Sequence, residues 1–182
     1  MKVRKLLLLL AALAVIITAL IVPPVLTYYT ATEEIPGVVT SGNIEYIIHN
    51  ELSSGSAAPE QFIVIPGDEV DRRLFVENVG QQPFYLRVKL VCTLGQQDAT
   101  GYVEPCAVDS NWTLVDGYYY YNTVLEPGQV SSALFTRLLI NGNKVDQTHI
   151  GQTLTFRADV ETVQSKNNPA DHPWDAAGWP AA

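Results

Sequence analysis

The sequence has little of what usually builds a catalytic or metal-binding centre. It contains two cysteines and three histidines in 182 residues. His49, His149 and His172 are widely spaced, and neither cysteine has a histidine beside it in the sequence. A His-Glu-x-x-His zinc helix, a Gly-x-Ser-x-Gly nucleophile elbow and a phosphate-binding glycine loop are all missing. We therefore predict no catalytic residue, no metal ligand and no cofactor.

Cations are scarce as well. The chain has 11 lysines and arginines against 19 acidic residues. Three of the cations precede residue 6 and every acid follows residue 32, so the charge from Tyr28 onward is 8 − 19 = −11. This charge argues against nucleic acid and anionic lipid surfaces as partners. The densest acidic group, Asp68, Glu69 and Asp71, is interpreted as a solvated turn; calcium binding is the alternative, although the alternating pattern of a calcium loop is missing.

The first residues have the layout of a secretory signal peptide. Three cations in Met1–Lys5 precede an apolar run over 6–22, which ends at a double proline. The small-residue rule favours a cut between Thr27 and Tyr28, which makes 1–27 the leader and predicts a secreted protein. The apolar run is also at the lower limit for a bilayer span, so a retained anchor is the alternative.

Helical periodicity is absent after residue 27, and apolar residues recur instead at every second position. The runs are separated by Pro-Gly, Asp-Gly and Asn-Gly turns about ten residues apart. This pattern predicts an all-β domain over 43–165, an antiparallel β-sandwich or jelly roll.

The stretch 66–90 carries the clearest signal. Pro-Gly-Asp at its start is a turn, and a mixed strand follows. From residue 84 the apolar residues alternate with Arg87 and Lys89, which a strand keeps on its outer face. We interpret the unit as a core hairpin whose second strand buries Phe84, Leu86, Val88 and Leu90.

Two other stretches read as strands. Residues 153–162 alternate as cleanly, with Leu154 and Phe156 on the inner face. Asp116-Gly117 joins two β-rich runs as a type I′ hairpin turn. The second run is a row of tyrosines, 118–121, which we expect to pack a sheet face; carbohydrate binding is the alternative.

The two cysteines, Cys92 and Cys106, enclose a polar segment rich in turn-forming residues. A cysteine pair in an exported chain meets an oxidising environment, so we predict a disulfide that closes a protruding loop. Free buried thiols are the alternative. The tail, 166–182, contains three prolines and many small residues. We expect it to be flexible unless Trp174 or Trp179 docks on the domain.

Several segments together resemble the TasA/camelysin-like family of bacterial exported proteins, which have a SipW-dependent type of signal peptide and include biofilm-matrix proteins. The matching pieces, in family order, are VLTYYTATEE, VVTSGNIEY, IPGDEV, VENVGQQPFYLRVKL, DGYYYY, LEPGQ, SALF and RADVETVQSKN. They are spread over most of the chain.

The resemblance implies a jelly roll that assembles into extracellular fibres, in the biofilm matrix or at the cell surface. In such fibres the N-terminal segment of one subunit completes the sheet of its neighbour, which makes the arm 28–42, and in particular Tyr28–Thr40, a candidate donor strand. The implied partners are other copies of the chain, a signal peptidase, and other matrix proteins or the cell wall. The alternatives are a camelysin-like surface metallopeptidase and a monomeric surface-binding domain.

Overall fold

A computed structural model describes residues 39–41, 44–145 and 147–181, and all of these belong to the unit 36–182. The predicted leader, the cut between Thr27 and Tyr28, and residues 28–38 of the arm lie outside the described residues.

The described residues form β-strands joined by turns and three short 3-10 helices, and every strand pair is antiparallel. This confirms the all-β prediction. None of these helices has the length and hydropathy that a bilayer span requires. The strands are β1 Val39–Ser41, β2 Ile44–Glu51, β3 Gln61–Ile63, β4 Glu69–Asp71, β5 Arg73–Asn78, β6 Phe84–Leu94, β7 Gln97–Asp98, β8 Val103–Cys106, β9 Trp112–Val115, β10 Tyr118–Tyr121, β11 Arg137–Ile140 and β12 Thr153–Gln164; the 3-10 helices are η1 Thr100–Tyr102, η2 Gln147–His149 and η3 Pro173–Asp175.

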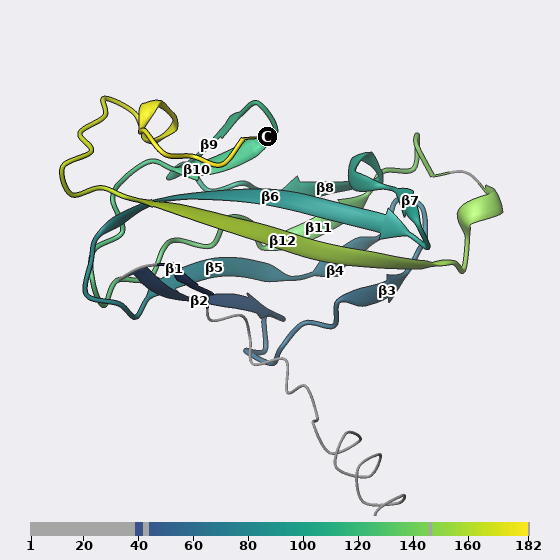
Figure 1. Ribbon diagram of the computed structural model, residues 1–182. Coiled ribbons are helices and arrows are strands. Elements are labelled where there is room, and N and C mark those ends of the chain that lie inside the picture. Colours follow the sequence, from purple (N-terminus) through teal and green to yellow (C-terminus); the bar gives the residue numbers. More distant parts are fainter. Residues whose placement is uncertain (1–38, 42–43, 146, 182) are drawn as a thin grey trace, which may run out of the picture. The chain divides into compact units, whose positions relative to one another are not determined.

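The largest sheet is built around the two longest strands. Its order is β3-β12-β6-β10-β9, and β7 pairs with the end of β6. β6 and β12 pair continuously, from Phe84 opposite Gln164 to Leu94 opposite Leu154. In Figure 1 they run side by side through the length of the domain. Their alternating sequences predicted both strands, because one side chain in two faces the core.

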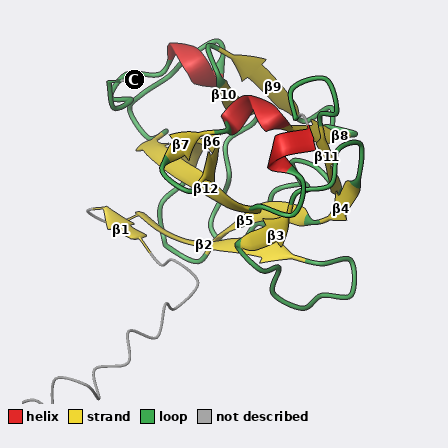
Figure 2. Ribbon diagram, turned by 90° about the vertical axis from the view of Figure 1, so that its right-hand side faces the viewer, coloured by secondary structure: helices red, strands yellow, loops and turns green. Residues whose placement is uncertain are grey.

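The second layer consists of two smaller sheets, β1-β2-β5 and β4-β11-β8. The chain passes directly from one sheet to the other, because a single residue, Arg72, separates β4 from β5. Residues 129–136 also run beside β5 before they enter β11; Ser131 N–H donates to the Val76 carbonyl and Leu134 N–H to the Leu74 carbonyl. Figures 1 and 2 show β2 and β5 in a layer apart from β6 and β12.

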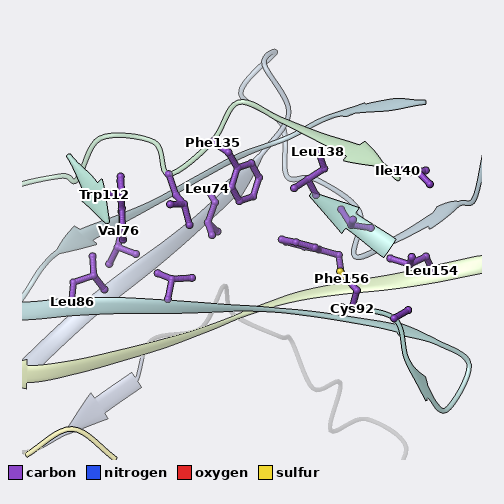
Figure 3. Close-up of a cluster of buried hydrophobic side chains, with 14 of the residues drawn as sticks. Leu74, Val76, Leu86, Cys92, Trp112, Phe135, Leu138, Ile140, Leu154 and Phe156 are labelled. Atoms are coloured by element: carbon purple, nitrogen blue, oxygen red, sulfur yellow. The ribbon is translucent and has the colours of Figure 1, made fainter. Parts of the chain in front are cut away.

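The core lies between these layers. In Figure 3, side chains from β5 and β11 point toward side chains from β6 and β12. The fully buried apolar residues include Phe84, Leu86, Val88, Leu74, Val76, Val64, Leu125, Leu134, Phe135, Leu138, Ile140, Leu154 and Phe156. The arrangement is therefore β-sandwich-like, with both layers contributing to one hydrophobic core.

The predicted core hairpin is wrong in its pairing. β5 pairs with β2, whereas β6 pairs with β7, β10 and β12. The connection 79–83 crosses between the layers, and the buried Asn78 amide holds its ends by donating to the Gln82 and Leu125 carbonyls. On β6, Phe84, Leu86 and Val88 are buried and Leu90 is partly buried.

The predicted disulfide is also wrong, because Cys92 and Cys106 are both free thiols. Cys92 points into the core from β6, while Cys106 ends β8 opposite Arg137 in the other layer. The segment between them is a crossover and no protruding loop, since Ala99 and Val103 are buried. Burial raises the pKa of the Cys92 thiol to about 12, so the thiol stays protonated.

Because both thiols are free, we predict that no disulfide contributes to the stability of the protein. We expect dithiothreitol to leave the urea unfolding midpoint unchanged, whereas loss of a disulfide closing such a loop would cost about 3 kcal/mol. Iodoacetamide should label Cys106 in the folded protein and Cys92 only after denaturation, because Cys92 is 1% exposed and poorly ionised. A midpoint that falls on reduction, or peptide mass spectra showing a linked pair, would contradict the free thiols.

Candidate functional site

The second layer has an incompletely covered edge along β2. On one side β2 pairs with β5 from Tyr46 to Glu51. On the other side β1 pairs only with Ile44–Tyr46, and a bridge from Glu51 to Ala57 covers the far end. Among the described residues, no strand lies beside Ile47–His49 on that side. Unpaired backbone groups on an edge strand can accept a strand from another chain.

The beginning of β2 is fixed by a close backbone contact. The N–H groups of Val79 and Gly80 both donate to the Glu45 carbonyl, at 3.1 and 3.0 Å. A Cβ added to Gly80 would lie 2.8 Å from the Glu45 nitrogen, which is closer than real Cβ contacts. Glycine is therefore required at position 80 for the crossover to approach β2.

Tyr46 connects β2 to the larger sheet. Its hydroxyl donates to the Val160 carbonyl at 3.1 Å, and the side chain is buried. Burial, with a smaller contribution from the charge of Glu161, raises the pKa of Tyr46 to about 12, so the hydroxyl remains a donor. The candidate edge is thus held rigidly over the core.

A second feature lies on the outer face of the six-stranded sheet, around Arg87. The sequence places this residue on the solvent face, yet it is 5% exposed. Its Nε donates to Glu161 Oε2 at 2.6 Å, Nη1 to the Tyr120 hydroxyl at 3.0 Å, and Nη2 to the Pro180 carbonyl at 2.8 Å. The C-terminal tail therefore covers the outer face of β6 at this point.

Aromatic rings enclose the same guanidinium group. Its Cζ lies 3.9 Å from the centre of the Tyr118 ring and 4.7 Å from that of Trp179. Trp179 also donates from Nε1 to the Pro173 carbonyl at 3.0 Å. The tail 166–182 was predicted to be flexible unless a tryptophan docks. Its described part, 166–181, is docked on the domain, because Trp179 packs over Arg87.

The tyrosine row supports both faces of the sheet. The hairpin turn is confirmed, with positive φ angles of 49° at Asp116 and 83° at Gly117. Tyr118 and Tyr120 are buried beneath the tail, while Tyr119 and Tyr121 pack against the main core. The packing interpretation therefore describes this row, and its two outward rings are not open to a carbohydrate while the tail is docked.

The remaining titratable residues are dispersed. In the acidic group, Glu69 pairs with Arg137, and hydrogen bonds from Ser53 to Asp71 lower the pKa of that carboxyl. His49 donates to or accepts from Glu77 at 2.9 Å. Within 39–41, 44–145 and 147–181, no three histidine, cysteine or acidic side chains come together in a way that could hold a metal ion.

Comparison of the chain with protein-family models, with curated proteins and with solved structures finds no match. The β2 edge and the docked tail are thus the two features on which a functional interpretation rests. Alternating apolar residues indicate a strand over 43–49, but this pattern does not show which side of the strand is open. The only sequence signal for the docked tail was the pair of tryptophans beyond a row of tyrosines.

We predict that Gly80→Ala lowers the free energy of unfolding by about 1–3 kcal/mol, because the new methyl group must displace backbone. Urea denaturation measures the change. Gly142→Ala is the matched control, since a Cβ at that position would lie at an ordinary 3.6 Å from the nearest atom. Equal midpoints for the two variants would show that the crossover moves away from β2 without cost.

We also predict that Arg87→Met loosens the tail and costs about 3 kcal/mol, because Glu161 loses its buried cationic partner. Tryptophan emission should shift to longer wavelength as the tail rings become hydrated. Lys89→Met is the control, since Lys89 is exposed on the same face of β6. Unchanged emission and stability in Arg87→Met would mean that the tail docks without this residue.

Proposed function

We propose that this protein is an exported structural protein whose copies join into extracellular fibres by strand addition. The observation that carries the proposal is the β2 edge: within the described residues, β1 pairs with Ile44–Tyr46 and no strand lies beside Ile47–His49 on that side. The order of segments that resembles the TasA/camelysin-like family supports the same function and a jelly-roll topology. The leader 1–27 would direct export, with signal peptidase cutting between Thr27 and Tyr28.

Strand exchange at this edge requires no new type of contact. Within one chain, Val39, Thr40 and Ser41 lie opposite Tyr46, Glu45 and Ile44. The same segment of a neighbouring copy could form these pairs instead, as in domain swapping. Exchange therefore replaces intramolecular pairs by identical intermolecular ones.

The sequence of the arm is long enough for a donor strand from a neighbouring copy to pair with β2 beyond Tyr46. Continuing the register of β1 would set Val38, Gly37 and Pro36 opposite Ile47, Ile48 and His49. Proline is tolerated there only where no ladder donor is needed, which fits the end of an added strand. A donor strand of six residues would thus pair with β2 from Ile44 to His49 through main-chain hydrogen bonds.

The two alternative functions are less well supported. A camelysin-like metallopeptidase needs a set of zinc ligands, and the described residues bring no such set together. A monomeric surface-binding domain is compatible with the fold, and the same experiment separates it from a fibre.

The test is electron microscopy of the purified exported protein beside a variant lacking Tyr28–Thr40. We expect fibres from the former and single particles from the latter, with the variant's fold verified by circular dichroism and urea denaturation. A synthetic peptide of residues 28–41 should bind the shortened variant, and a scrambled peptide of the same composition should not. Fibres formed equally well without the arm, or single particles from the intact protein, would refute strand exchange.

A further inference from the structure

We infer that the docked tail presents a polysaccharide-binding surface built from Trp174 and Trp179. The inference is independent of fibre formation. Both indole rings are only partly buried, although each is held by its neighbours. Trp174 stacks on His172 at 4.5 Å between ring centres, with an angle of 14° between planes. Trp179 lies over Arg87.

The two rings share one support. Each contacts Tyr120 edge to face, with ring centres 6.1 Å away for Trp174 and 5.5 Å away for Trp179. Tyr120 is itself buried and anchored to Arg87. One residue of the tyrosine row, Tyr120, therefore supports both tryptophans.

The tail is also braced internally. The side-chain amide of Asn168 donates to the Ala177 carbonyl at 2.9 Å and accepts from the Ala177 N–H at 3.0 Å. Pro173 and Ala176 are buried, and Ala176 packs with Tyr85 and Val163 of the sheet. A ligand would meet rings that are already fixed in place, which lowers the entropic cost of binding.

An open cleft of about 400 Å³ borders the tail and provides polar groups. The side chains of Gln164 and Lys166 on its wall are exposed, and no side-chain hydrogen bond or ion pair to another described residue engages them. They are available to bond sugar hydroxyl groups. The lining also includes Ile44 at the start of β2 and Gly178, which precedes Trp179 in the tail.

Each indole ring keeps part of its surface exposed, and Gln164 and Lys166 offer an amide and an ammonium group on the cleft wall. This combination of aromatic and hydrogen-bonding groups selects the ligand class. A pyranose ring presents a face of C–H bonds that stacks on an aromatic ring, and its hydroxyl groups point outward to polar side chains. Asp171 and Asp175 are exposed on the same tail, and the whole chain has a net charge of −8. An anionic polymer would be repelled, so the ligand is an uncharged polysaccharide.

The experiment combines retention on insoluble cellulose and chitin with fluorescence titration by cellohexaose and by the N-acetylglucosamine hexamer, using the purified exported protein. The chain has three tryptophans, and Trp112 is buried at 5% exposure, so a change in emission reports the tail. We expect retention on at least one polymer and a saturable emission change with the matching oligosaccharide.

Trp174→Ala is the decisive variant, because the contacts that dock the tail on Arg87 come from Trp179 and Pro180. We expect binding about tenfold weaker, the loss of one aromatic contact of roughly 1.4 kcal/mol. Trp174→Phe should keep part of the affinity. Leu114→Ala, which removes an apolar side chain exposed on β9, is the control for non-specific adhesion and should bind like the unchanged protein.

Each outcome decides the inference. Weaker binding by Trp174→Ala, at an unchanged urea midpoint and with Leu114→Ala unaffected, supports the surface. Absence of retention and of any emission change with both sugars overturns it. So does equal binding by Trp174→Ala, or an equal loss in Leu114→Ala.

Discussion

The ladder between β6 and β12 is the constraint on which the rest of the structure depends. It is the longest strand pair of the described chain, and both of its faces are used. Inward residues such as Leu86 and Phe156 form one wall of the core. Outward residues Tyr85 and Val163 instead receive the tail. A slip of one residue in this register would exchange the two sets and destroy the core and the tail site together.

Two buried polar residues of the second layer, Arg72 and Asn78, differ in how their hydrogen-bonding groups are satisfied. Arg72, at the break between β4 and β5, is fully buried between Phe62 and Phe156, where burial lowers its pKa to about 10. It donates to the Pro59 carbonyl, while its Nε and Nη1 have no partner among the described residues. Asn78, in contrast, has both its donor and acceptor groups satisfied. A buried cation with unmet donors is costly, so aromatic contact from both sides must offset part of that cost.

Sequence periodicity predicted the strands well and their partners poorly. Counting by twos from Leu74 reaches Asn78 at the end of β5 and Arg72 just before its start, and both are buried. Their polar side chains do not indicate burial in the sequence. Pairing between β6 and β12 joins residues about 70 positions apart, and nothing local in the sequence specifies it. The same limit explains the wrong disulfide prediction. Cys92 and Cys106 lie in different layers, and this depends on the pairing of strands that are distant in the sequence. Arg87 was assigned to the correct face, yet its cover comes from Trp179 at the far end of the chain.

Strand addition requires a row of free backbone groups, and the strands at the sheet edges differ in how many they offer. The six-stranded sheet ends in β3 and β9, which have three and four residues. Short edges of this kind discourage pairing with another chain. β2 is longer, and the crossover at Gly80 contacts its start. Within the part of the chain that the structure describes, β1 covers only Ile44–Tyr46 on its other side. The tail closes the outer face of the larger sheet, and the cleft beside it is also lined by Ile44, which pairs with Ser41 at the start of β2. Strand exchange at β2 and ligand binding at the tail therefore meet at Ile44, so the two processes share a border on one subunit.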